Sequence, residues 1–154
     1  MASKEATTKG VKRHALVIPG TSLPGSAVCE VLIERGFLVF GASLNIHCPA
    51  LVEKSVIPIE FAYGDVSSIE TAIKLSRANA VVFATDFYGA AGRNQFIEIE
   101  HGKIIIDACK KLNVGYVVYL SIADADKDVK IDQFASKNSV ECYLKETLTT
   151  SHVS

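Results

Sequence analysis

The chain has 154 residues, of which 49% are hydrophobic and 21% are charged, and its formal net charge is -1. This length favours one domain, and the apolar content is sufficient for a packed core, which argues against global disorder. The near-neutral charge offers no basic face that could neutralise several phosphates of a duplex, so direct nucleic-acid binding is disfavoured.

Apolar periodicity and turn residues predict alternating strands and helices after a disordered tail over residues 1–12. Strands are predicted at residues 15–18, 37–42, 56–61, 80–85 and 116–120. Helices are predicted at about residues 25–35, 67–77, 94–112 and 136–148, with one further helical turn at 49–54. Pro58 suits the third strand to an edge position, whereas the apolar runs 80–85 and 116–120 predict buried strands. Ser67 or Ser68 is expected to cap the helix that follows, with Glu70 completing a capping box with Ser67.

Strands that alternate with helices predict a parallel sheet with right-handed crossovers. The expected architecture is therefore an α/β, Rossmann-like, doubly wound domain over residues 13–150, with strand order 3-2-1-4-5. Any ligand is expected at the switch point beside the first strand, where the strand order reverses.

The segment after the first strand occupies the place of a dinucleotide-binding turn, but its glycines are incomplete. Gly25 can allow close packing of helix and strand, whereas Pro19 and Ser22 stand where the other two glycines are expected,. Pro19 removes a backbone donor, and the Ser22 side chain crowds the pyrophosphate position. The helix N-terminus still offers amide donors for an anion. The candidate binding residues here are Gly20, Thr21, Ser22, Leu23, Pro24 and Gly25, with the amides of residues 21–26 as donors.

The end of the second predicted strand does not select a cofactor. An acidic residue there would bind the ribose hydroxyl of NAD, and an arginine would bind the 2′-phosphate of NADP. The chain has Ser43, Leu44 and Asn45, none of which is charged. A domain that kept its fold and lost its cofactor therefore stays open as an interpretation.

The four cysteines show neither a C-x-x-C pair nor the spacing of a metal site,. Cys29 and Cys109 fall on apolar helix faces and are expected in the core, whereas Cys48, in a predicted loop, is the candidate for an exposed thiol. The first ten residues are polar, unlike a signal peptide, and no apolar run reaches membrane-spanning length. We therefore expect a reducing setting, cytoplasmic or nuclear, with no membrane association.

Several stretches together resemble the NmrA-like family of atypical short-chain dehydrogenase relatives. They are residues 17–28, the pair Gly64-Asp65, and residues 82–88, 100–121 and 134–141. The resemblance implies a Rossmann fold that binds NADP(H) or NAD(H). It aligns Leu44 with an arginine that holds the 2′-phosphate, and it places Asp65 near the adenine. It also places Thr85 and Asp86 along the nicotinamide side.

Lys137 falls where some reductases of the wider group keep a catalytic lysine. Gln133 stands where a Tyr-x-x-x-Lys pair would need its tyrosine, so the usual acid/base couple is missing,. Two interpretations of Lys137 remain open: a proton relay or contact to the nicotinamide ribose, or a solvated lysine near a helix start.

The resemblance also leads us to expect a short C-terminus, because family members continue past the last helix and only residues 149–154 follow here. An open or absent substrate pocket would result, with an exposed sheet edge that favours a homodimer. Three functions follow as hypotheses. The first is an NmrA-like regulatory or redox-sensing protein with a protein partner and no dehydrogenase turnover. The others are an atypical NAD(P)-dependent reductase that uses Lys137, and a degenerate Rossmann fragment without cofactor.

Overall fold

The computed structural model of the protein describes residues 11–148. Residues 149–154 and all but the last two residues of the expected tail therefore lie outside the described part. The strands are β1 (His14–Ile18), β2 (Leu38–Ser43), β3 (Ile57–Glu60), β4 (Ala80–Phe83) and β5 (Tyr116–Tyr119). The helices are α1 (Leu23–Glu34), α2 (Pro49–Glu53), α3 (Val66–Ser76), α4 (Gln95–Lys111) and α5 (Asp132–Leu148).

All five strands are parallel and lie in the order β3-β2-β1-β4-β5, which confirms the predicted sheet. β3 carries Pro58 at one edge of the sheet, as predicted, because proline cannot donate to a neighbouring strand,. The order reverses at β1, so the turn after β1 lies at the switch point of the carboxyl edge.

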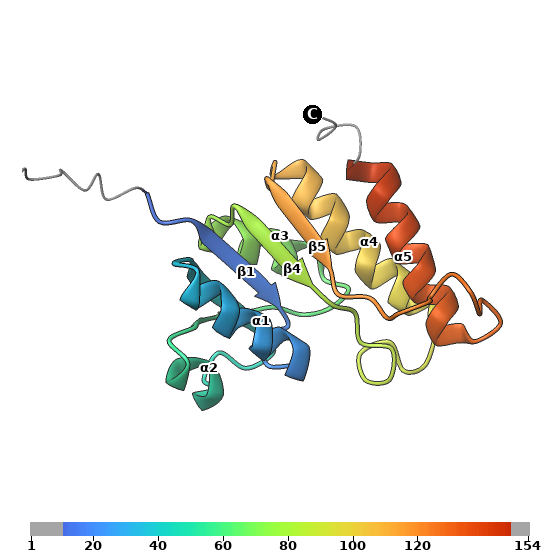
Figure 1. The fold of residues 1–154 in the computed structure, drawn as a ribbon, viewed down its shortest axis with the longest axis horizontal. Coiled ribbons are helices and arrows are strands. Elements are labelled where there is room, and N and C mark those ends of the chain that lie inside the picture. Colours follow the sequence, from blue (N-terminus) through green and yellow to red (C-terminus); the bar gives the residue numbers. More distant parts are fainter. Residues whose placement is uncertain (1–10, 149–154) are drawn as a thin grey trace, which may run out of the picture.

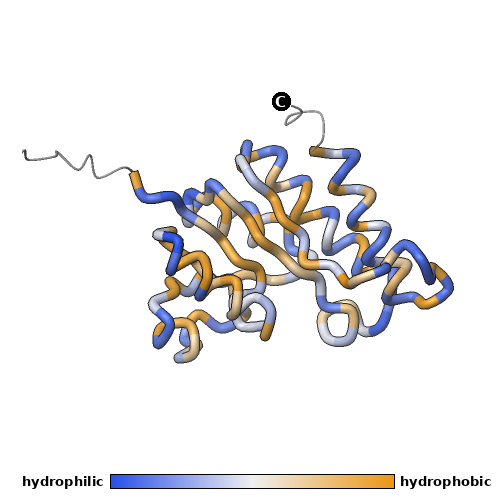
Figure 2. The backbone as a smooth tube through the Cα atoms, in the orientation of Figure 1, coloured by the Kyte–Doolittle hydropathy of each residue, from blue (hydrophilic) through white to orange (hydrophobic). Residues whose placement is uncertain are grey.

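The sheet is covered on both faces, as Figure 1 shows: α1 and α2 lie on one side, and α3, α4 and α5 lie on the other. β1 serves both layers because its side chains alternate. Leu16 and Ile18 pack toward the α3–α5 side, and Val17 packs toward α1. Figure 2 shows the strands as a hydrophobic centre with hydrophilic segments around it.

Helix α1 begins at Leu23, two residues before its predicted start at about residue 25, and the starts of α3 and α5 also differ from the predicted ones. Asp65, and not Ser67 or Ser68, caps α3, because its carboxylate accepts the N–H of Ser68 at 3.0 Å. The predicted capping box is therefore wrong, and Glu70 instead pairs with Lys111 of α4 at 2.9 Å. Helix α5 begins at Asp132, one turn before the predicted start at residue 136. Asp132 suits a first helical turn because its charge complements the helix dipole.

The expectation that residues 116–120 form a buried strand is wrong for one of the two faces. Val117 and Tyr119 pack on the core under α4, but Tyr116 is 70% and Val118 is 48% exposed. β5 is the second edge of the sheet, and α1 packs on β1 and β2 instead of covering it. An apolar run thus predicted the strand but not its position in the sheet.

Cys29 and Cys109 are buried in the two cores, as predicted. Burial raises the pKa of the Cys29 thiol to about 11 and that of Cys109 to about 12, so neither is a reactive thiolate at neutral pH,. Cys48 is half-buried at the start of α2, whereas Cys142 on α5 is exposed. The prediction that Cys48 carries the exposed thiol is therefore wrong.

Candidate functional site

The turn after β1 is held by two close backbone approaches that only glycine allows. A Cβ atom on Gly25 would lie 2.0 Å from the carbonyl oxygen of Pro19. A Cβ on Gly20 would lie 2.7 Å from the Cα of Gly41 in β2, and the Gly20 N–H donates to the Ala42 carbonyl at 2.9 Å. The turn therefore packs directly between α1 and β2, the close packing that a dinucleotide turn requires.

Only part of the predicted row of amide donors is available. Ser22 caps α1, so its hydroxyl accepts the N–H of Gly25 at 3.0 Å, and its carbonyl accepts the N–H of Ser26 at 2.8 Å. Pro24 has no N–H to donate. Within residues 11–148, the N–H groups of Thr21, Ser22 and Leu23 have no hydrogen-bond partner. The donor set for an anion is therefore these three amides, not the whole run 21–26.

Lys137 is buried, so its interpretation as a solvated lysine is wrong. Its Nζ lies 2.5 Å from Glu98 Oε1, with 7% of the lysine side chain and none of the glutamate side chain exposed. It also donates to Thr85 Oγ1 at 3.3 Å. The early start of α5 places Lys137 in the second helical turn, on the face that packs against α4.

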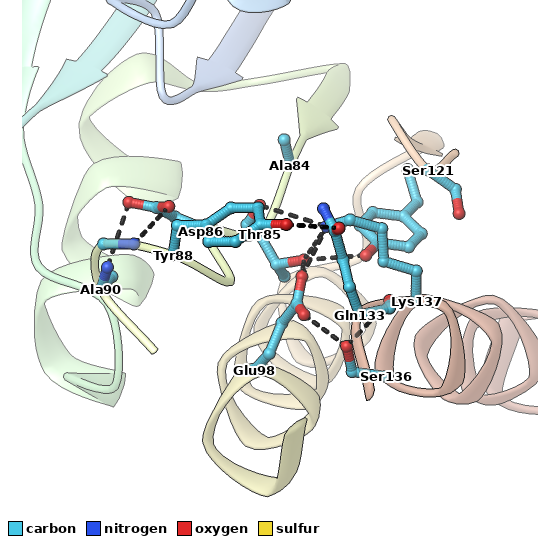
Figure 3. A network of polar contacts seen from close by, with 12 residues as sticks. Ala84, Thr85, Asp86, Tyr88, Ala90, Glu98, Ser121, Gln133, Ser136 and Lys137 are labelled. Atoms are coloured by element: carbon cyan, nitrogen blue, oxygen red, sulfur yellow. Dashed lines mark hydrogen bonds and ion pairs between the residues drawn. The ribbon is translucent and has the colours of Figure 1, made fainter. Parts of the chain in front are cut away.

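Glu98 is the centre of this cluster, and Figure 3 shows Thr85, Ser136 and Lys137 converging on it. Thr85 Oγ1 donates to Glu98 Oε1 at 2.5 Å, and Ser136 donates to Glu98 Oε2. The Tyr119 hydroxyl lies 2.8 Å from Thr85 Oγ1, and burial raises the pKa of Tyr119 above its usual range. The cluster thus ties the end of β4 to α4, α5 and β5.

The sequence carries a signal for Glu98 that lies outside the binding motifs. All but one of the buried residues of α4 follow a helical stripe at positions 98, 101, 102, 105, 106 and 109, and Ala108 is buried beside it. Glu98 lies on that stripe at the spacing of an inward-facing side chain. A carboxylate on a buried stripe requires a partner, and Lys137 is the cation that the fold brings to it.

The side chain of Asp86, predicted to line the nicotinamide side, instead bonds to the backbone of its own loop. Its carboxylate accepts the N–H groups of Gly89 at 2.9 Å and Ala90 at 3.1 Å, as Figure 3 shows for Ala90. Thr85 is only 8% exposed, and its hydroxyl points into the Glu98 cluster. Both residues follow β4 at the carboxyl edge of the sheet, but the side chains of both already have protein partners.

His101 of α4 lies under the loop that follows β3. Its ring stacks on Tyr63, with centroids 5.3 Å apart, and the Tyr63 hydroxyl donates to the Ala84 carbonyl at 2.7 Å. The buried Nδ1 of His101 has no hydrogen-bond partner among the described residues. Burial lowers the pKa of His101, although Glu98, Glu100 and Asp86 oppose the shift. Gly64 has a φ of +79° here and passes close to the ring.

Leu44 and Asp65, predicted on the adenine side, do come together. They line one cleft of about 630 Å³ formed by the end of β2, by β3 and by α3. Leu44 is 71% exposed. Within residues 11–148 no group of three or more His, Cys, Asp or Glu side chains could hold a metal ion. In the same range, no helix combines the length and the apolar character needed to cross a bilayer.

A scan against known protein families finds no match for the chain. Among solved structures, it is similar to Citrobacter triphenylmethane reductase in complex with NADP(H), with TM-score 0.73 and 15% identity over 87% of this chain and 46% of that one. It is also similar to Bordetella bronchiseptica WbmH in complex with NAD+, with TM-score 0.68 and 21% identity over 90% of this chain and 53% of that one.

A third similar structure is an Escherichia coli NADPH-dependent quinone oxidoreductase in complex with NADPH, with TM-score 0.71 and 17% identity over 87% of this chain and 45% of that one. The chain spans about half the length of these proteins. These likenesses show a Rossmann-like fold, which this chain shares with structures that hold NADP(H), NAD+ or NADPH.

Proposed function

We propose that the protein is an NmrA-like, NAD(P)(H)-binding protein that acts in regulation or redox sensing and does not turn over a dehydrogenase substrate. The observation that carries the proposal is the turn after β1. It combines the Gly25–Pro19 close approach with three unpartnered amides, at residues 21–23, at the switch point of a parallel sheet,. The similar solved structures hold the dinucleotides NADP(H), NAD+ and NADPH.

The residues present fit a dinucleotide in a definite order along the carboxyl edge. The amides of Thr21, Ser22 and Leu23 would hold the pyrophosphate, with help from the α1 dipole. The cleft at Leu44 and Asp65 would take the adenosine. The backbone just beyond β4, at Thr85 and Asp86, would face the nicotinamide, since the side chains of both residues already have protein partners. When bound, the cofactor would supply hydride chemistry; the chain itself contributes binding and orientation.

The absence of turnover rests on the surroundings of Lys137. A lysine that donates or relays a proton needs access to the reacting group. Here the ammonium is buried against Glu98, and the tyrosine position of a Tyr-x-x-x-Lys pair is Gln133, whose side chain accepts from Tyr88 at 3.1 Å. In this proposal Lys137 links β4, α4 and α5, so its role is structural.

Calorimetric titration of the purified chain with NADP+, NADPH, NAD+ and NADH tests the proposal. A dissociation constant near the micromolar range, which is a binding free energy of about -8 kcal/mol, supports dinucleotide binding at the turn after β1. A redox-sensing role further requires that the oxidised and reduced forms bind with different affinity. No heat with any of the four contradicts the proposal and supports the degenerate, cofactor-free fragment.

A second candidate is an atypical reductase that uses Lys137, favoured by the contacts of the Lys137 Nζ and the Tyr119 hydroxyl with Thr85 Oγ1, just beyond the end of β4. The test is NADPH or NADH oxidation with a panel of quinones and carbonyl compounds. Turnover that Lys137→Met abolishes, in a variant that still binds nucleotide, would favour the reductase over the regulator.

A further inference from the structure

The cleft beside β3 has a charge pattern that bears on which dinucleotide the site accepts. Apolar side chains form its walls, among them Leu44, Ile46 and Leu75. The charged side chains that line it are both acidic, Glu60 at the end of β3 and Asp65 at the start of α3. No lysine or arginine is among the described residues that line this cleft.

The cleft lies in line with the turn after β1. The Gly20 N–H bonds to Ala42 at the end of β2, and the Phe61 N–H bonds to the Ser43 carbonyl at 3.0 Å, so the ends of β1, β2 and β3 are in register. In a doubly wound sheet, the adenosine of a dinucleotide leaves the turn across the end of the second strand. An adenosine on that path enters the cleft between Leu44 and Asp65.

The nearby cations do not reach this cleft. Lys54 lies on the α1 side, where its Nζ donates to Ser26 Oγ at 2.5 Å and pairs with Glu30 at 2.7 Å. His47 lies on the exposed loop beyond Leu44 and does not line the cleft. A 2′-phosphate placed here would therefore meet two carboxylates with no lysine or arginine to balance its charge.

We propose, building on the proposed dinucleotide site, that this cleft selects NAD(H) over NADP(H). A 2′-phosphate requires the forked donors of an arginine, which Leu44 does not supply. A ribose hydroxyl, by contrast, is a donor that a carboxylate accepts. Asp65 uses Oδ1 to cap α3, and its Oδ2 has no hydrogen bond to any described residue. The selection thus combines repulsion of the phosphate with an available acceptor for the hydroxyl.

The experiment is direct titration of the native chain with the four nucleotides at about pH 8, where an ordinary histidine is neutral. We expect NAD(H) to bind at least about tenfold more tightly than NADP(H). Equal or tighter binding of NADP(H) overturns the preference and leaves the dinucleotide site standing. Binding of none of the four overturns the site and the preference together.

A variant that gains affinity for NADP(H) provides a second test. It compares each nucleotide between the variant and the native chain, so the result does not depend on the absolute affinities of the native chain. Leu44→Arg places a guanidinium at the mouth of the cleft, and the exposure of Leu44 lets it fit without disturbing the core. We expect it to tighten NADP(H) about tenfold and to leave NAD(H) within about twofold. Leu44→Gln, of similar length and no charge, is the matched control and should tighten neither. An arginine variant that leaves NADP(H) unchanged would show that the 2′ position does not lie here.

Discussion

Lys137 and Glu98 form a buried ion pair, 2.5 Å between Nζ and Oε1, that joins α5 to α4 beneath the end of β4. Two hydroxyl groups, from Thr85 and Ser136, satisfy the same carboxylate. A buried pair of this kind is costly to break because removal of one partner leaves the other charge without water or a counter-ion.

The first prediction concerns this pair. Lys137→Met or Glu98→Leu should each lower the free energy of unfolding by about 3–5 kcal/mol, whereas the double variant should recover much of the loss. Urea denaturation measures both effects. Lys111→Met, which removes an exposed partner of Glu70, is the control and should cost less than about 1 kcal/mol,. Single variants no worse than this control would contradict a buried pair.

The second prediction concerns pH and His101. Burial lowers the pKa of native His101 below the value of about 6.5 that it has in the unfolded chain,. As the pH falls below 6.5, the unfolded chain binds a proton that the native chain does not, so the free energy of unfolding decreases. This loss continues until the pH passes the native pKa.

Urea denaturation at several pH values, with His101→Phe alongside, checks that dependence. In His101→Phe, the free energy of unfolding should decrease less as the pH falls than it does in the native chain. His47→Gln changes a histidine on an exposed loop and should leave that decrease as it is in the native chain. An NMR titration of His101 gives the sign directly. A native pKa of His101 at or above the ordinary histidine value of about 6.5 would contradict the burial argument.

The third prediction concerns Gly25. Alanine normally favours a helix interior over glycine by about 1 kcal/mol, but a Cβ here would lie 2.0 Å from the Pro19 carbonyl,. Gly25→Ala should therefore lower the free energy of unfolding by about 1–3 kcal/mol, and any nucleotide binding at the turn should weaken. Glu34→Ala, at the exposed end of α1, is the control. It should change the free energy of unfolding by no more than about 0.5 kcal/mol. Thermal denaturation and nucleotide titration measure the two effects.

The fourth prediction concerns Ser22, whose hydroxyl accepts the hydrogen bond of the Gly25 N–H. Ser22→Gly removes that acceptor, so the Gly25 N–H becomes available to a phosphate. The cost to helix stability should be only a few tenths of a kcal/mol, since glycine is itself a tolerated cap. Calorimetry should show several-fold tighter nucleotide binding, as expected for one added charge-assisted hydrogen bond. Weaker binding would mean that Ser22 contacts the nucleotide itself.

The fifth prediction concerns the β5 edge and the expected homodimer. The Tyr116 N–H donates to Asn79, just before β4, and the Leu120 N–H donates to Phe83 of β4. The N–H groups of Val117 and Tyr119 therefore point to the open edge. Antiparallel pairing with a second copy across a twofold axis would satisfy them and cover Val118. Sedimentation velocity should show a dimer that Val118→Lys weakens. A native chain that stays monomeric at high concentration would exclude this pairing.

The sequence by itself determined which elements form and how they are ordered. Strand alternation predicted the parallel sheet and its 3-2-1-4-5 order, and Pro58 predicted an edge, because these signals depend on backbone chemistry and local side-chain period,. Gly25 was identified for the same reason, since the close approach of α1 to the preceding turn is a local requirement.

The tertiary structure decided which side chains are buried and with what partners. Lys137 changed from a possible surface lysine to half of a buried ion pair because α4 and α5 bring residues 39 positions apart together. Val118 is exposed because no helix of the described residues covers its face of β5, and Cys142, not Cys48, presents its thiol. Such contacts depend on where elements lie in space, so a local pattern predicts the element but not its neighbours.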